Sequence, residues 1–140
     1  MSRLIKIKDT LSPDLVAKAR LVRNKRPLLT AMGRSVVSLG KRAFTDSGLR
    51  PAVWVARKKP ASHRLLQKST TLRKSIRITG YGSSSVTVGS DRKYAAVHQL
   101  GSKKKNIPAR PFLPFVKGRL SARGKKAVDS AMRAFLRERG

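Results

Sequence analysis

Apolar residues recur at helical spacing in three stretches of the chain, and we expect a helix in each. The first helix is predicted over about residues 13–24, where Ser12 and Pro13 suit the N-cap and the first helical position. The second is predicted over about 27–44 and the third over about 121–136. Their apolar stripes consist of Leu11, Leu15, Ala19 and Val22; of Leu29, Met32, Val36, Leu39 and Ala43; and of Val128, Ala131, Met132 and Phe135.

Two glycines lie inside the second predicted helix. Gly33 and Gly40 each cost a helix about 1 kcal/mol relative to alanine. We expect another element to pack closely against the helix at these positions and so offset that cost.

Alternating apolar and polar residues predict a β-hairpin over about residues 74–89. Ile76 and Ile78 alternate with polar residues, and so do Val86 and Val88. Residues 80–84 between them supply the turn. One apolar and one polar face on each strand is typical of an antiparallel sheet that is covered on one side. Leu4, Ile5 and Ile7 predict a further, short edge strand.

The remaining stretches are less regular. Residues 94–100 predict a short helix that stops at Gly101, and residues 107–115 hold three prolines, which require an extended path. A long irregular segment over about residues 44–66 carries Trp54. We therefore predict an α+β fold: one small domain over residues 1–140 with N-terminal helices, an antiparallel β-hairpin sheet and a C-terminal helix.

Charge narrows the range of partners. The 34 Lys and Arg residues outnumber six acidic residues, which gives a net charge of +28. A compact chain with this charge repels itself, so we expect nucleic acid, or else an acidic protein surface, to offset the field. The sequence has no cysteine, no pattern of a signal peptide and no apolar stretch near the roughly 20 residues of a membrane span. We expect a protein of a cytoplasm-like compartment without a membrane partner.

Two motifs resemble the signature of the phage virion-morphogenesis family, which includes tail-completion proteins such as the G protein of phage Mu. They are YAAVHQLG at residues 94–101 and IPARPFL at residues 107–113, joined by a short basic loop. The upstream order is also similar: two helices, Phe44, a loop with a lone Trp54, and a Leu-Arg pair that leads into the hairpin. The resemblance spans nearly the whole chain.

The resemblance implies a structural role in a tailed-phage particle. Copies of such proteins assemble into a ring, usually a hexamer, at the end of the tail nearest the head. The implied partners are the chain itself, a head connector or head-completion protein, tail-tube and sheath proteins, and the double-stranded DNA that passes through. The implied location is the neck or tail of the virion, after assembly in the host cytoplasm.

Candidate functional residues fall into two groups. The expected subunit interface consists of Trp54, Tyr94, His98, Gln99, Pro108, Arg110, Pro111, Phe112 and Phe115, because Arg and aromatic residues are favoured at interfaces. On this reading, loss of Phe112 disrupts assembly more than folding. An equally weighted reading is that the prolines only stiffen a strand. The expected contacts to DNA or an acidic partner are Arg57, Lys58, Lys59, Lys103, Lys104 and Lys105.

Catalysis finds no support in the sequence. The acidic residues are scattered, His63 and His98 lack further ligands at metal-binding spacing, and no nucleophile motif is present, so we expect no enzyme, metal or cofactor. The alternative to a ring is a free, sequence-nonspecific nucleic-acid-binding protein; a hydrolase or nuclease would need a carboxylate cluster. A hexamer of +28 chains carries +168, whereas a ring of this size encloses roughly 20–24 DNA phosphates, so we expect much of the charge to face acidic proteins or solvent.

Overall fold

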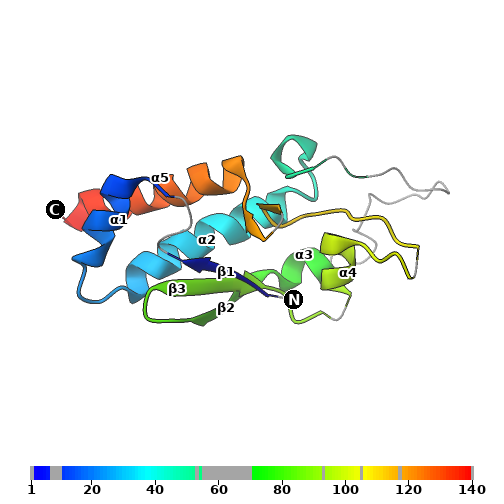
Figure 1. Ribbon diagram of the computed structural model, residues 1–140, viewed down its shortest axis with the longest axis horizontal. Coiled ribbons are helices and arrows are strands. Elements are labelled where there is room, and N and C mark those ends of the chain that lie inside the picture. Colours follow the sequence, from blue (N-terminus) through cyan, green and yellow to red (C-terminus); the bar gives the residue numbers. More distant parts are fainter. Residues whose placement is uncertain are drawn as a thin grey trace.

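The computed structural model describes residues 2–6, 11–52, 54, 71–92, 94–104, 106–116 and 118–139. These residues form an α+β fold, as the sequence predicts (Figure 1). In chain order, the elements are β1 (Ser2–Lys6), α1 (Pro13–Arg20), α2 (Arg26–Arg42), the 3-10 helix η1 (Ser47–Leu49), α3 (Thr71–Ser75), β2 (Arg77–Tyr81), β3 (Ser85–Gly89), α4 (Ala95–Leu100), β4 (Phe115–Val116), β5 (Arg119–Leu120) and α5 (Ala122–Arg139).

Helix α2 is the central element. It packs against α5 on one side and against β2 and β3 on the other, while α1 packs against α5 (Figure 1). The predicted stripes form the shared core, since almost all of their members are buried and Val22, Ala131 and Phe135 are partly so. The described residues therefore bury one continuous apolar cluster between the two long helices and the sheet.

The two helix glycines allow close packing, as predicted. A Cβ atom at Gly33 would lie 2.7 Å from Ile78 Cδ1, and one at Gly40 would lie 3.0 Å from Leu113 Cδ2. A side chain at Gly33 would force the Ile78 side chain to shift. The cost of glycine in this helix is thus offset by the close approach of the sheet and of the proline-containing segment 107–115.

The sheet has three antiparallel strands in the order β1-β3-β2, so β1 is an edge strand as predicted and β2 is the other edge. In register, Leu4 pairs with Thr87 and Ile78 with Val88, and a β-bulge follows Ile78. Ile5, Val86 and Val88 are fully buried. The sheet therefore carries its apolar face toward α2.

Several predicted boundaries are wrong, and two of them have a clear local cause. The hairpin begins at Arg77 and not at 74, because residues 71–75 form α3, which buries Leu72 and closes with a hydrogen bond from Ser75 Oγ to Leu72 O (2.6 Å). The first helix ends at Arg20 and not at 24. Asn24 instead accepts a hydrogen bond from the Arg26 backbone N–H (3.2 Å), a local turn that competes with the helix and leads into α2.

Three smaller details differ from the sequence prediction. Ser12 holds the N-cap position of α1, but its hydroxyl donates to Asp129 Oδ2 (2.8 Å) and so ties α1 to α5. The β4–β5 hairpin was not predicted; Gly118, with a φ of 78°, lies between its strands. Helices α2 and α5 end at Arg42 and Arg139 rather than at 44 and 136. No helix among the described residues is both long and apolar enough to span a bilayer.

Candidate functional site

The two motifs fold into one unit, which we call the motif segment (residues 94–115, described except for 105). Gln99 on α4 is its centre and is only 4% exposed. The Gln99 side-chain oxygen accepts hydrogen bonds from the backbone N–H groups of Phe112 and Leu113 (both 3.0 Å), and its amide donates to Leu113 O (3.2 Å). Prolines lack an N–H group and leave this segment with few strand partners, so the Gln99 side chain bonds three of its backbone groups.

Backbone contacts bring the two motifs close together. Arg110 N–H donates to His98 O (2.7 Å), and Gly101 ends α4 with a φ of 76° and an N–H bonded to Val97 O (2.6 Å). A Cβ atom at Gly101 would lie 2.8 Å from the backbone nitrogen of Ala109. Glycine is required there both by the left-handed backbone and by the approach of the second motif.

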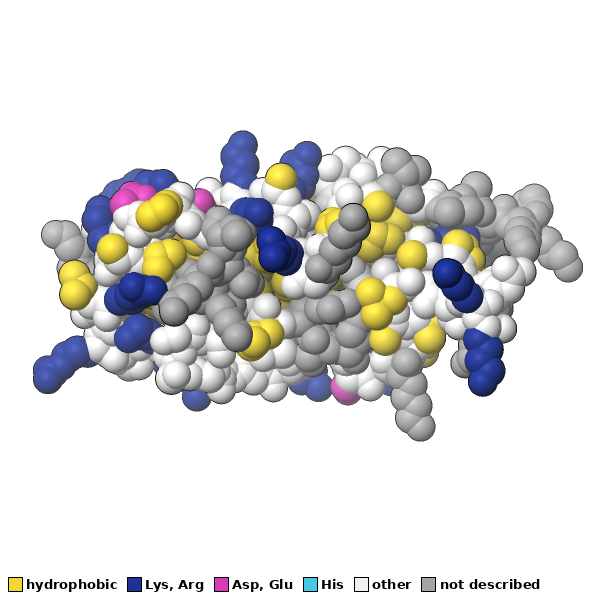
Figure 2. Space-filling view, in the orientation of Figure 1, with side chains coloured by type: hydrophobic (Ala, Val, Ile, Leu, Met, Phe, Trp, Pro, Cys, Tyr) yellow, Lys and Arg dark blue, Asp and Glu magenta, His cyan; other side chains and the backbone are white. Residues whose placement is uncertain are grey.

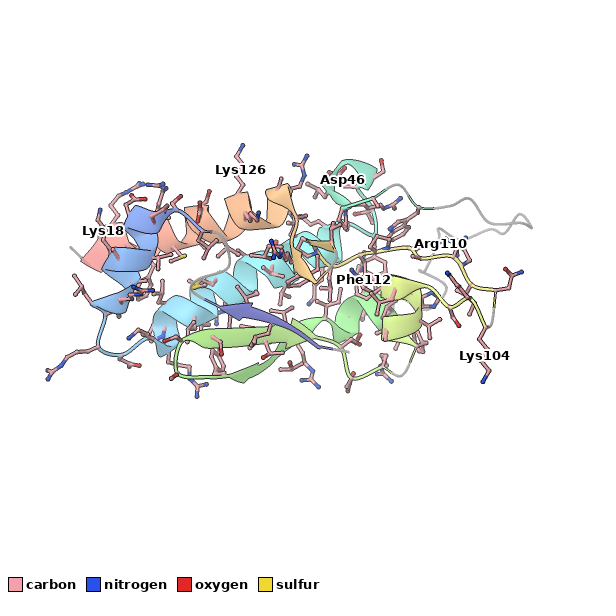
Figure 3. The ribbon with its side chains drawn as sticks, in the orientation of Figure 1. Lys18, Asp46, Lys104, Arg110, Phe112 and Lys126 are labelled. Carbon is pink, nitrogen blue, oxygen red and sulfur yellow. The ribbon has the colours of Figure 1, made fainter. Side chains whose placement is uncertain are left out.

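The basic loop between the motifs projects from one end of the molecule. Ser102 and Ile107 exchange two backbone hydrogen bonds (both 2.8 Å), and Asn106 adopts a φ of 53° in the turn. Lys103 and Lys104 are exposed at this turn, and Lys104 lies at the opposite end of the long axis from Lys18 (Figure 3). The loop therefore presents positive charge well away from the core.

Trp54 joins the motif segment to α2. Its indole N–H donates to Pro111 O (2.7 Å), and its ring packs edge-on against Phe44 with centroids 5.8 Å apart. The Arg50 guanidinium lies 3.6 Å from the Trp54 ring centroid and donates to the carbonyls of Ala43 (2.6 Å) and Phe44 (3.1 Å). Burial lowers the pKa of Arg50, and the negative charge of Asp46 offsets part of that shift. Arg50 thus closes the end of α2 and covers Trp54.

His98 lies half-buried beside Arg110. Burial lowers the pKa of His98 below its ordinary value of 6.5, and the positive charge of Arg110 lowers it further. Its Nδ1 atom is buried without a hydrogen-bond partner in the described part of the chain, and its ring lies 5.8 Å from that of Tyr94. At neutral pH the imidazole is therefore uncharged.

Stability should fall on mild acidification because of His98. Its folded pKa is depressed, so below about pH 6.5 the unfolded chain binds the proton more readily than the folded chain does. The free energy of unfolding should therefore drop as the pH falls from 6.5 through the lower, folded pKa. Above pH 6.5, His98 should leave the free energy of unfolding unchanged. Urea unfolding at pH near 7.5 and 5.5 should show a larger drop for the natural chain than for His98→Gln. Equal drops would contradict this assignment.

Burial divides the residues predicted for a subunit interface. Trp54, Gln99, Phe112 and Phe115 are buried within this chain, and Phe112 is 1% exposed. Their side chains have a place in the core that needs no neighbour, so we now expect loss of Phe112 to affect folding first. Tyr94 is 42% exposed, while His98, Pro108, Arg110 and Pro111 are half-buried. Leu100 was not among the residues predicted for the interface, and it is 61% exposed. Its position directly before the glycine that ends the helix was the available sign that it could be exposed.

The cationic surface is broader than the sequence runs suggested. Arg57, Lys58, Lys59 and Lys105 lie outside the described residues. A row of exposed cations on α5 was missed, although its helical spacing was visible in the sequence. We call it the α5 row, and it consists of Arg123, Lys126, Arg133 and Arg137. Lys126 points outward from α5 (Figure 3), and Figure 2 shows many basic and few acidic side chains on one face.

Metal-binding chemistry has no site in the part of the chain that the structure describes. No three His, Cys, Asp or Glu side chains gather there at a distance suited to an ion. What the described residues offer is a rigid motif segment with exposed apolar residues at one end, and separate cationic surfaces. Both suit binding to other macromolecules.

Comparisons with known proteins match the chain to one family and to parts of other proteins. The sequence profile described as the phage virion morphogenesis family matches residues 4–137. An uncharacterized protein of Methanocaldococcus jannaschii is 49% identical over 51 residues, 36% of each chain. The DNA-directed RNA polymerase subunit beta' of Colwellia psychrerythraea is 28% identical over 144 residues, 99% of this chain but 9% of that subunit. The chain thus spans well under two thirds of either curated relative. No solved structure matches it.

Proposed function

Because the chain belongs to the phage virion morphogenesis family, we propose that it is a tail-completion subunit whose copies close a ring around DNA at the head–tail junction. Membership gives the coarse role, which is structural work in building the phage particle. The ring, its usual hexameric form, its place at the neck and its contacts with a connector, tail tube or sheath are parts of the proposal.

The observation that carries the proposal is the rigid motif segment. Gln99 and Trp54 both hydrogen-bond to the backbone of Pro111–Leu113, which ties α4 to the second motif. At the same end of the molecule, Tyr94 and Leu100 expose apolar surface. In a closed ring, each subunit makes the same contact with its neighbour. A rigid element with exposed apolar residues is suited to form such a contact.

Charge supports the passage of DNA through the ring. The α5 row and the exposed Lys103 and Lys104 offer contacts to phosphates, and Tyr94 is the only aromatic side chain that is largely exposed among the described residues, too few for a base-stacking platform. We therefore expect any DNA contact to be sequence-independent. The α5 row also favours the second candidate, a free nucleic-acid-binding protein. That protein would bind DNA tightly as a monomer, with steep salt dependence.

Assembly should depend on Leu100. At 61% exposure, Leu100→Asp should change the free energy of unfolding by only about 0.5 kcal/mol, because it removes little buried surface. The same change puts a charge into the proposed apolar contact and should weaken self-association by at least about tenfold in sedimentation velocity.

Ser130→Asp is the matched control, since it adds the same charge at an exposed position of α5. It should assemble as the natural chain does. Equal assembly of Leu100→Asp and the natural chain would remove α4 from the interface, and loss of assembly in both variants would show that net charge alone decides.

A further inference from the structure

We infer that a groove between α2 and β2 binds an acidic segment of a neighbouring virion protein, with apolar side chains of that segment seated on the groove floor. The groove holds about 540 Å³, room for several side chains but not for a folded domain. Its lining residues are Arg34, Val37, Ser38, Lys41, Arg42, Ile76, Arg77 and Ile78.

The floor of the groove is apolar. Val37 and Ile78 are partly buried against the core, and Ile76, which also lines the groove, is buried. Ile78 reaches this position because Gly33 leaves room for it on α2. An occupant with apolar side chains would remove the exposed parts of Val37 and Ile78 from water, which favours binding at roughly 25 cal/mol per Å².

The rim of the groove is cationic and poorly neutralised. Arg34, Lys41 and Arg42 stand on α2, and none of them forms an ion pair with a described acid. Arg77 on β2 meets Asp91 at 3.6 Å, but both side chains are more than half exposed, so the pair is weak. The groove thus combines an apolar floor with positive charge that an acidic segment would complement.

Another copy of this chain does not fit the groove. Its six acids are Asp9, Asp14, Asp46, Asp91, Asp129 and Glu138, and the nearest two in sequence are five residues apart. No short segment of the chain therefore offers clustered negative charge. Contacts among like copies would bring more positive charge to the rim, so the complementary occupant is a different protein.

Duplex DNA fits the α5 row better than it fits the groove. Phosphates need cations but gain nothing from the apolar floor of Val37 and Ile78. In addition, β2 is an edge strand, so the backbone at Arg77 and Ile78 lies beside the groove on a sheet edge. An extended protein segment can pair with such an edge and place alternate side chains over the floor.

This inference rests on the proposed function, because it requires other virion proteins as neighbours. The two fail separately: self-association is measured on the chain alone, whereas the groove is tested with a peptide. The probe is a labelled peptide of about ten residues, with two leucines among glutamates, titrated against the full chain by fluorescence anisotropy. A second peptide carries serine in place of both leucines.

The double variant Arg34→Gln/Lys41→Gln should weaken binding of the leucine peptide by about tenfold or more. The control Arg123→Gln/Lys126→Gln removes the same charge from the α5 row and should change affinity by less than about threefold. The serine peptide should bind the natural chain about tenfold more weakly than the leucine peptide.

Three results would overturn the inference. Equal losses in the two double variants would mean that only net charge attracts the peptide. Equal binding of the serine and leucine peptides would remove the apolar floor from recognition. A greater loss of duplex DNA binding in the groove variant than in the α5-row variant would assign the groove to DNA. Val37→Ser, which leaves every charge in place, provides a further check and should also weaken the leucine peptide.

Discussion

Replacing Phe112 by alanine is expected to lower the free energy of unfolding by about 3–5 kcal/mol. Phe112 is 1% exposed, and its ring lies 5.4 Å from that of Phe44. The substitution leaves a cavity beside Phe44, and the surrounding structure relaxes only partly around such a cavity. A domain of this size is stable by about 5–15 kcal/mol, so the variant should be close to unfolding at room temperature. Urea denaturation followed by circular dichroism measures the change.

Phe112→Leu is the matched variant for this test. It keeps most of the buried apolar volume and should cost about 1.5 kcal/mol. A Phe112→Ala chain that stays fully stable but fails to assemble would contradict burial in the core and restore the side chain to the subunit interface.

Replacing Gln99 by methionine should cost about 3 kcal/mol, because methionine fills the same space without polar atoms. The backbone N–H groups of Phe112 and Leu113 would then lose their partner, while the carbonyl of Leu113 would keep only its hydrogen bond from the Phe115 N–H (2.7 Å). Each buried group left unpaired costs about 1–3 kcal/mol, and neighbouring losses do not add fully. The same urea titration measures this effect, and hydrogen exchange at Phe112 and Leu113 should accelerate with it.

Lys126→Met is the control for a surface methionine and should leave stability within about 0.5 kcal/mol. If Gln99→Met were as stable as this control, the three hydrogen bonds would contribute nothing to holding the second motif in place.

Local patterns in the sequence predicted most of the framework. The apolar stripe from Leu29 to Ala43 gave α2 and its buried face, and Gly33 and Gly40 indicated close packing that the structure confirms. The end of α1 was missed because Asn24 forms a turn that helical spacing does not reveal. Helix α3 was missed because its five residues are too few for a periodic signal.

The candidate site was predicted as residues but not as geometry. Sequence motifs marked Gln99, Trp54 and Phe112, yet their burial follows from contacts across 13 or more positions, such as Gln99 with Phe112 and Trp54 with Pro111. No pattern along the chain encodes such pairings. The α2–β2 groove depends in the same way on two elements brought together by the fold, which is why charge counting alone did not locate it.

The most direct measurement is the mass of the purified full chain in solution at physiological salt, by sedimentation velocity over a wide concentration range. A ring-forming subunit should give one discrete species whose mass is a whole multiple of the 15.5 kDa chain, with six as the expected multiple. A 15.5 kDa monomer at every concentration would contradict the proposed ring.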